Sequence, residues 1–219
     1  MLTFQKFKIM FIIILAIMAL LVSFGLRTSE RTRPVSRIIR VVAIVMILVG
    51  LASSCVVQIE SGEVGVPTLC GKVNNEILNS GLNIVNPFVV VRKFNVRTQN
   101  YTMSGIADQG DQVGDDAIRV LTSDGLELTL DVSVLYRVVA AQTPKILKTI
   151  GNDYSSIIVR PVTRTKIRDN ATFYNAVDLY SNKRGEFQKK IFNDIDSDFK
   201  NRGLELEQLL VRNIRCRLR

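Results

Sequence analysis

Four aspartates gather in one glycine-containing stretch, and they are the first residues whose type and spacing suggest chemistry. The stretch, residues 104–117 (SGIADQGDQVGDDA), contains Asp108, Asp111, Asp115 and Asp116. Carboxylate oxygens bind Ca²⁺, but an EF-hand loop needs acids at alternate positions and a closing glutamate, and this spacing fails that test. Paired-carboxylate catalysis is disfavoured too, because nothing apolar nearby would raise the pKa of one carboxyl group. We predict a solvated, flexible loop without metal ligands or a catalytic acid.

Other catalytic motifs are missing from the sequence. Histidine is absent, which removes the usual general base and the commonest transition-metal ligand. No G-x-S-x-G elbow positions a nucleophilic serine. The segment GEVGV at residues 62–66 contains glycines but lacks the Lys-Ser/Thr pair of a nucleotide-binding loop. We therefore predict that the protein is not an enzyme and has no catalytic, cofactor-binding or metal-binding residues.

Cysteine offers one modification site. The three cysteines show no metal-ligand spacing, and an odd number does not indicate a disulfide framework. Cys55 ends the segment LVGLASSC, which looks like a bacterial lipoprotein signal with Cys55 as the acylated residue, although Leu51 stands one place too far from it. The alternative is a cysteine that serves as a small apolar residue near a helix end. Lipidation would suit a different function, an extracytoplasmic lipoprotein that binds a lipid or a small ligand.

Four basic residues recur at helical spacing between positions 160 and 168. They are Arg160, Arg164, Lys166 and Arg168. The simplest interpretation is a solvated helix face. The functional interpretation is a contact with an anionic lipid surface or with an acidic neighbouring subunit in an oligomer.

Two uncharged apolar runs, residues 9–26 and 41–57, precede the rest of the chain. Both are near the lower limit for a helix that crosses a bilayer, which needs about 20 residues. Neither has the polar stripe of a buried core helix. A removable signal peptide is the alternative for the first run, but the following segment RTSERTRPVSRIIR is a poor cleavage setting. We predict one or two transmembrane helices within a membrane anchor over residues 1–57.

The distribution of charge predicts the topology of this anchor. The loop 27–40 carries five arginines, and short arginine-rich loops stay cytoplasmic. Residues 58 onward are then extracytoplasmic, at the inner (plasma) membrane. Residues 1–54 account for +6 of the net charge of +9. The positive charge is therefore a membrane-flank signal and gives no indication of nucleic-acid binding.

After the anchor, apolar residues alternate with polar ones, which indicates strands. Val57, Ile59 and Val64, Val66 flank the Ser61-Gly62 pair, which predicts a tight hairpin. Residues 89–101 predict an edge strand or a bent one. Residues 117–122 and 126–138 predict an antiparallel hairpin across SDG, in which Gly125 takes the unusual backbone angle.

Helices follow in the last third of the chain. Thr143 as a cap and Pro144 predict a short helix that stops at Gly151, and a second helix should run over residues 153–169 with a kink at Pro161. The clearest helix, residues 181–202, has apolar residues every four positions and ends at Gly203, before a return strand. Those apolar residues are Phe187, Ile191, Ile195 and Phe199. This order predicts an α+β domain with helices packed on one face of a mostly antiparallel sheet.

Several segments, in order, resemble a known family. They are SGEVGVPTLCGKV, GLNIVNPFVVVRKFNVRTQNY, TSDGLELTLDVSVLYRV, IVRPVTRTKIRD and GLELEQLLVRNI. Together they look like the SPFH or band 7 domain, and most like its prohibitin branch, over about residues 56–214. The resemblance implies that the first hairpin lies against the membrane. It also implies assembly into homo-oligomeric rings or cages, or with a related SPFH subunit, and regulation of an AAA-type membrane protease.

The expected organisation is an anchor (1–57), an SPFH domain (58–214) and a basic tail (215–219). Two features depart from the family pattern. The sequence given has no segment that matches the family's coiled coil, and it has two apolar runs where prohibitins have one anchor. We expect a membrane-anchored scaffold that organises membrane proteins.

Overall fold

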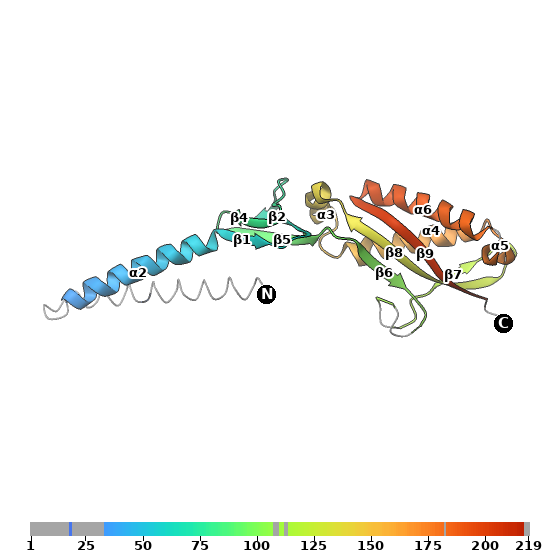
Figure 1. Ribbon diagram of the computed structural model, residues 1–219, viewed down its shortest axis with the longest axis horizontal. Helices are drawn as coiled ribbons and strands as arrows, with labels where there is room; N and C mark the ends of the chain where they lie inside the picture. The colour runs from blue at the N-terminus through green and yellow to red at the C-terminus, as the bar shows by residue number, and fades with distance from the viewer. Residues whose placement is uncertain (1–17, 19–32, 107–109, 112–113, 182, 217–219) are drawn as a thin grey trace.

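The computed structural model describes residue 18 and residues 33–106, 110–111, 114–181 and 183–216. Figure 1 shows an elongated molecule in which a long helix leads into small sheets and then into a larger sheet covered by helices. The predicted run 9–26 lies outside the described residues, apart from Met18.

The long helix, α2, spans Arg33–Ser54. It starts inside the segment 27–40 that we predicted to be a loop, and it ends before Val57, where we expected the second apolar run to end. Among the residues that the structure describes, no helix combines the length and the apolar character needed to cross a membrane. The described residues therefore do not support the predicted transmembrane helices.

Two small antiparallel sheets follow α2. One consists of β1 (Val56–Ile59) and β4 (Gly81–Ile84), and the other places β2 (Glu63–Leu69) between β3 (Lys72–Val73) and β5 (Val89–Asn95). The predicted hairpin between β1 and β2 is therefore wrong. The turn exists, with Gly62 at φ +82°, but β1 pairs with β4 and β2 pairs with β3 and β5.

The reason is that β1 stacks on β2 instead of pairing with it. The side chain of Ile59 lies against Gly65 of β2, where an added Cβ would come within 2.6 Å of the Ile59 Cδ1 atom. A face-to-face contact leaves the β1 edge free for β4. The Gly62 carbonyl accepts a hydrogen bond from the Val96 N–H (3.0 Å), and the Ser61 carbonyl accepts one from the Arg97 guanidinium. The turn therefore docks against the linker between the small and large sheets.

The large sheet is built on β8 (Glu127–Val138), which pairs with β6 (Gln99–Met103), β7 (Ile118–Leu121) and β9 (Leu204–Cys216). The β7–β8 hairpin is confirmed, with Gly125 at φ +77°. The predicted bent strand over 89–101 divides into β5 and β6, which lie in different sheets. Three residues between them, 96–98, form the linker.

Helices cover one face of the large sheet (Figure 1), and the predicted α+β fold is confirmed. The helical elements after β8 are η3 (Ala140–Gln142), α3 (Thr143–Thr149), η4 (Ser155–Val159), α4 (Arg160–Ala171), α5 (Ala176–Tyr180) and α6 (Arg184–Asn201). Of these, α3 contacts β2 and β3 of the small sheets. The four-residue apolar stripe of α6 is fully buried. The predicted kink at Pro161 takes the form of a π-helical turn, η4, just before it, because proline lacks an N–H group and its ring crowds the preceding turn.

Aromatic rings join the small sheets to the large one. The Tyr154 ring stacks on Phe94 of β5, with ring centroids 6.2 Å apart, and meets the edge of Tyr136 of β8 at 6.3 Å. The Tyr154 hydroxyl also donates to the Gln99 side chain (3.0 Å). Burial raises the pKa of Tyr154, because a phenolate is poorly solvated there. These contacts fix the orientation of the two parts.

Replacing Gly62 by alanine tests the docked turn. Residue 62 has a positive φ, and an added Cβ there would overlap the Arg97 side chain. We expect the free energy of unfolding to fall by about 1–3 kcal/mol, because the backbone is strained and the hydrogen bond from Arg97 to the Ser61 carbonyl is lost. Urea unfolding of the full chain in detergent, followed by circular dichroism, measures this. Gly125→Ala is the control, because Gly125 also has a positive φ but has open space around it. Equal losses in the two variants would contradict the docking.

Candidate functional site

Exposed apolar side chains gather where α2 meets the small sheets. The Val85 N–H group donates to the Cys55 carbonyl at 2.7 Å, and Ile84 pairs with Val56, the first residue of β1. The end of β4 therefore lies beside the end of α2. Ile84 is 87% exposed, and Phe88, in the following turn, is 76% exposed. Large apolar side chains this exposed indicate a contact with another apolar surface.

The same end of the molecule carries further exposed apolar residues, which we call the apolar rim. Its members are Val56, Leu69, Leu82, Ile84, Phe88 and Val90. They lie near one another along the chain fold, because β2 ends at Leu69, which pairs with Val89 directly after the β4–β5 turn. Residues 77–91 contain no charged side chain. The rim is therefore a set of exposed apolar side chains, most of them in an uncharged stretch of the sequence.

Two hydrogen bonds accepted by Asn86 hold the β4–β5 turn in shape. Its side-chain oxygen accepts from the Phe88 N–H (3.0 Å), and its carbonyl accepts from the Val89 N–H (2.9 Å). Such a local turn satisfies backbone groups without using tertiary contacts. The Phe88 ring consequently remains exposed on a defined turn.

Helix α2 continues the apolar surface away from the rim. Large apolar side chains at eight of its positions between 41 and 51 are at least 37% exposed. Successive helix residues are about 100° apart, so these positions cover more than half of the helix circumference. A helix in water normally shows a polar face opposite an apolar stripe. Between Val41 and Leu51, α2 contains no polar side chain.

Cys55, the predicted lipidation site, lies between α2 and β1. It is half-buried, and its N–H group donates to the Ala52 carbonyl at 3.2 Å. Its carbonyl group accepts the hydrogen bond from the Val85 N–H group, next to the rim. The lipidation of Cys55 stays a prediction.

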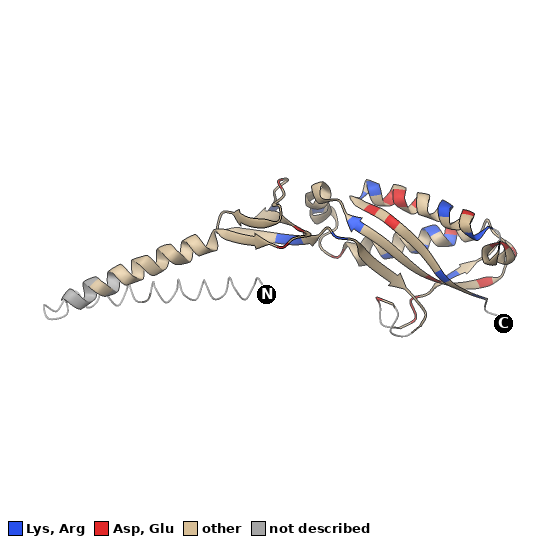
Figure 2. Ribbon diagram, in the orientation of Figure 1, with Lys and Arg blue, Asp and Glu red and all other residues tan. Residues whose placement is uncertain are grey.

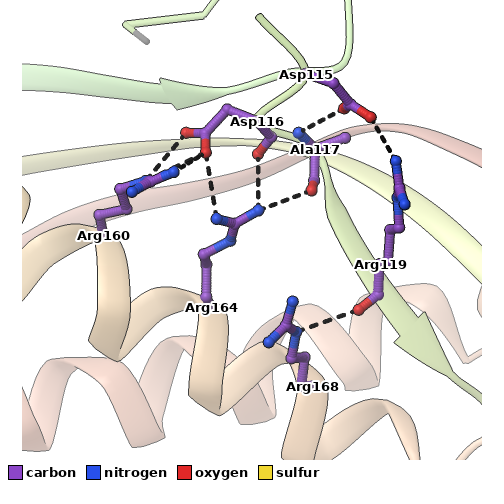
Figure 3. A network of polar contacts seen from close by, with 7 residues as sticks. All are labelled: Asp115, Asp116, Ala117, Arg119, Arg160, Arg164 and Arg168. Carbon is purple, nitrogen blue, oxygen red and sulfur yellow. Dashed lines mark hydrogen bonds and ion pairs between the residues drawn. The ribbon is translucent and has the colours of Figure 1, made fainter.

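The predicted basic cluster forms a network with the loop before β7 (Figure 3). The Asp116 side chain is 3% exposed and binds two arginines of α4. The Arg160 Nε lies 3.1 Å from one Asp116 oxygen, and the Arg164 Nη1 lies 3.3 Å from the same oxygen. The hydrogen bond to Asp116 raises the pKa of Arg160. This buried carboxylate is thus charge-paired, which offsets its loss of hydration.

Two of these arginines also cap the outer edge of β7. Arg164 donates to the Ala117 carbonyl (2.9 Å), and Arg168 donates to the Arg119 carbonyl (3.2 Å). Helix positions i and i+4 are about 6 Å apart along the axis, and strand positions i and i+2 are about 6.6 Å apart. The spacing of the arginines therefore matches the spacing of the carbonyl groups that point outward from the edge strand.

The opposite edge of the sheet is capped in the same way. From α6, Arg184 donates to the Val211 carbonyl of β9 and Gln188 donates to the Leu209 carbonyl, both at 2.6 Å. Uncapped edge strands invite pairing with other chains. These caps satisfy carbonyl groups that would otherwise be available for such pairing.

The structure thus gives the predicted basic residues partners within the chain. The fourth, Lys166, pairs with Asp198 of α6 at 3.2 Å. A contact of the cluster with lipid or with a neighbouring subunit stays a prediction, and it would have to compete with these internal bonds.

The acidic stretch divides into separate roles. Asp111 accepts a hydrogen bond from the Thr102 N–H, and Asp115 pairs with Arg119 at 2.7 Å, which lowers the pKa of Asp115. Asp108 lies outside the described residues. Within the described ranges, no group of three or more acids or cysteines is arranged to hold a metal ion. Ser197 and Lys200 of α6 have the S-x-x-K spacing found at some serine nucleophiles. Lys200 instead forms an ion pair with Asp196.

A comparison with known families decides where this chain belongs. The model of the SPFH domain / Band 7 family matches residues 57–217. The chain belongs to the SPFH domain / Band 7 family. No curated protein matches the chain.

Sequence reasoning missed the rim of this SPFH domain. The sequence signal that could have revealed the rim is the absence of charged residues from 77 to 91, a stretch that includes GLNIVNPF. Alternation predicts that every second residue of a strand is buried. β1 and β4 form only a two-stranded ribbon, and among the described residues no element covers the face that carries Val56 and Ile84.

Replacing Asp116 by alanine tests the buried network in this SPFH domain. Arg160 and Arg164 would lose their carboxylate, and we expect the free energy of unfolding to fall by about 2–4 kcal/mol, a value discounted for the partial exposure of Arg160. The control is Asp115→Ala, which removes an adjacent exposed ion pair and should cost less than about 1 kcal/mol. Denaturant unfolding of both variants measures the difference. Similar values for the two would show that Asp116 is not a structural partner.

Proposed function

We propose that this SPFH chain is a membrane-anchored, non-enzymatic scaffold of the prohibitin type. It assembles with copies of itself or with a related SPFH subunit, and it organises membrane proteins or regulates an AAA-type membrane protease. Its family supports a role at membranes, and the apolar rim beside α2 is the observation that carries the proposal.

The rim supports membrane contact on energetic grounds. A fully buried Ile or Phe side chain is stabilised by roughly 1.5–3 kcal/mol relative to water. Ile84 and Phe88 are mostly exposed within the chain, so a bilayer surface would supply this stabilisation. The proposed anchor, α2, ends beside them, so both surfaces meet the same membrane.

The proposed topology rests on the arginine-rich segment. Residues 27–40 contain five arginines and precede the apolar part of α2, and arginine-rich flanks of membrane helices stay on the cytoplasmic side. The SPFH domain then lies on the extracytoplasmic side of the inner (plasma) membrane.

A lipoprotein is the second candidate, because Cys55 is hydrogen-bonded to Val85, which follows β4 beside the rim. An acyl chain on its thiol would enter the same membrane surface. The two candidates share the orientation of the domain and differ in whether residues before Cys55 are retained.

A tryptophan at position 88 tests the membrane contact, because the chain contains no tryptophan. We expect Phe88→Trp, reconstituted as the full chain in vesicles, to show blue-shifted emission and at least about twofold quenching by brominated lipids, since an indole at the interface leaves bulk water. The control is Phe173→Trp in the loop before α5, where the native side chain is 71% exposed. It should emit as a hydrated residue. Equal quenching of the two, or none at position 88, would overturn the proposal.

The proposed side of the membrane has its own test. A periplasm-sensitive reporter fused after Arg219 should be active, because the domain that precedes it is extracytoplasmic. A reporter of cytoplasmic folding at the same position should be inactive. The reverse pattern would refute the topology while leaving the membrane contact of the rim intact.

A further inference from the structure

Three exposed basic residues lie close behind the apolar rim, on the small sheets and on the helix that contacts them. They are Lys72 of β3, Arg92 of β5 and Lys148 of α3. Figure 2 shows blue on the β5 ribbon, between α2 and the large sheet. We call these three residues the basic collar. They come from three different elements, so the sequence does not show them as a cluster.

Lys72 lies at the same level of its sheet as the rim. Leu69, a rim residue on the central strand β2, pairs with Lys72 on one side and with Val89 on the other. Neighbouring strands are about 4.8 Å apart, so the Lys72 backbone lies about 10 Å from Val89 across the sheet. Lys72 is therefore level with the β4–β5 turn that carries Phe88.

Arg92 lies further from the turn, on the face of β5 that also carries a rim residue. Val90, Arg92 and Phe94 share this face, because side chains alternate along a strand. Val90 is 49% exposed, Arg92 is exposed and Phe94 is 2% exposed. Arg92 is three residues after Val89, which places its backbone about 10 Å further along the strand. The face thus changes from apolar at the rim to basic and then to buried core.

Lys148 adds a third positive charge to the same region. Its Nζ donates to the Asn75 Oδ1 atom at 2.6 Å, just after β3, and its helix α3 contacts β3. The Asn75 amide is neutral, so this hydrogen bond orients the ammonium group without neutralising it. Within the described part of the chain, none of the three collar residues forms an ion pair.

Acidic residues of the small sheets are concentrated at the other end, near the linker. The Glu63 carboxylate, at the start of β2, lies 3.5 Å from the Lys93 Nζ. Glu60 comes directly before the docked turn. Only Glu76 follows the collar residue Lys72 closely in the sequence. The linker end therefore has acids to balance its bases, whereas the rim end has three bases and one acid.

We propose that the basic collar binds the phosphate groups of an anionic phospholipid, so that the chain prefers bilayers rich in such lipids. This inference rests on the proposed function, because the rim must meet the bilayer before the collar can reach a headgroup. The headgroup region is roughly 5–8 Å thick on each side of the hydrocarbon. With Phe88 at the edge of the hydrocarbon, Lys72 is at headgroup level. The longer reach of Arg92 is covered by its flexible side chain, which extends toward the phosphates.

The rim and the collar make different contributions to membrane contact. Burial of Ile84 and Phe88 depends on apolar area and not on the headgroup, so the rim accepts any fluid bilayer. Lysine and arginine close to an anionic membrane surface are attracted to it. Removing the collar should therefore change which lipids surround the domain, and it should leave the contact of the rim with the bilayer in place.

Lipids with brominated acyl chains measure which lipids surround the rim. The full chain with Phe88→Trp is reconstituted in phosphatidylcholine vesicles with about 30 mol% phosphatidylglycerol, and the bromine is placed on one lipid or on the other. The quenching in each case gives that lipid's share of the neighbours of position 88. We expect the share of phosphatidylglycerol to be at least about twofold above its mole fraction. Salt at about 1 M, which shortens the screening length to about 3 Å, should remove this preference.

A combined variant tests the collar residues. Lys72→Gln/Arg92→Gln/Lys148→Gln should lower the share of phosphatidylglycerol to its mole fraction and leave the summed quenching by the two lipids unchanged. The matched control removes three positive charges from exposed residues of α6 and β9, with Lys189→Gln, Lys190→Gln and Arg212→Gln combined. It should keep the preference. Circular dichroism establishes that both variants are folded.

The possible outcomes separate this inference from the proposed function. Quenching in proportion to mole fraction with an intact collar would overturn the inference and leave the rim contact standing. A collar variant that keeps the preference, or a control that loses it equally, would overturn the inference as well. No quenching by either lipid would overturn the proposed function, and the collar with it.

Discussion

Carbonyl groups that point outward from the edges of the large sheet are the constraint on which the distal part of this SPFH domain depends. β8 provides the centre of the sheet, and its neighbours β7 and β9 are left with outer edges. Helices α4 and α6 close both edges with side chains one helical turn apart. The match between the helix rise and the strand rise makes this possible. Asp116 then holds Arg160 and Arg164 in position.

This constraint also explains a basic cluster that could have been assigned to lipid. Arginine spacing in a sequence does not reveal whether the guanidinium groups meet solvent, lipid or backbone, because all three use the same helix face. The nearby acid is separated by 44 residues from Arg160, so only the tertiary fold brings them together. The exposed apolar residues Ile84 and Phe88 lie at the other end of the molecule, beside the end of α2.

Periodicity predicted the elements whose environment is simple. The strand over 126–138 and the helix around Phe187, Ile191 and Phe199 are found as expected, each with its apolar face buried. In the middle of the strand, Asp131 and Ser133 on the opposite face are buried as well. The β1–β2 hairpin failed because the sequence shows the Ser61-Gly62 turn but not the packing of Ile59 over Gly65. The rim was missed for a related reason: strand alternation assumes that an apolar residue is covered by the chain itself. The short helix α5 has too few residues for a periodic signal.

The central claim is that the small sheets rest on the bilayer through the rim while the large sheet extends away from it. Resonance energy transfer to acceptor-labelled lipids measures this directly, with a donor dye at Ser80, before β4, or at Ser123, in the β7–β8 turn. The account predicts strong transfer from position 80 and much weaker transfer from position 123. Equal transfer from the two positions would mean that the domain lies flat on the membrane, and it would contradict the account.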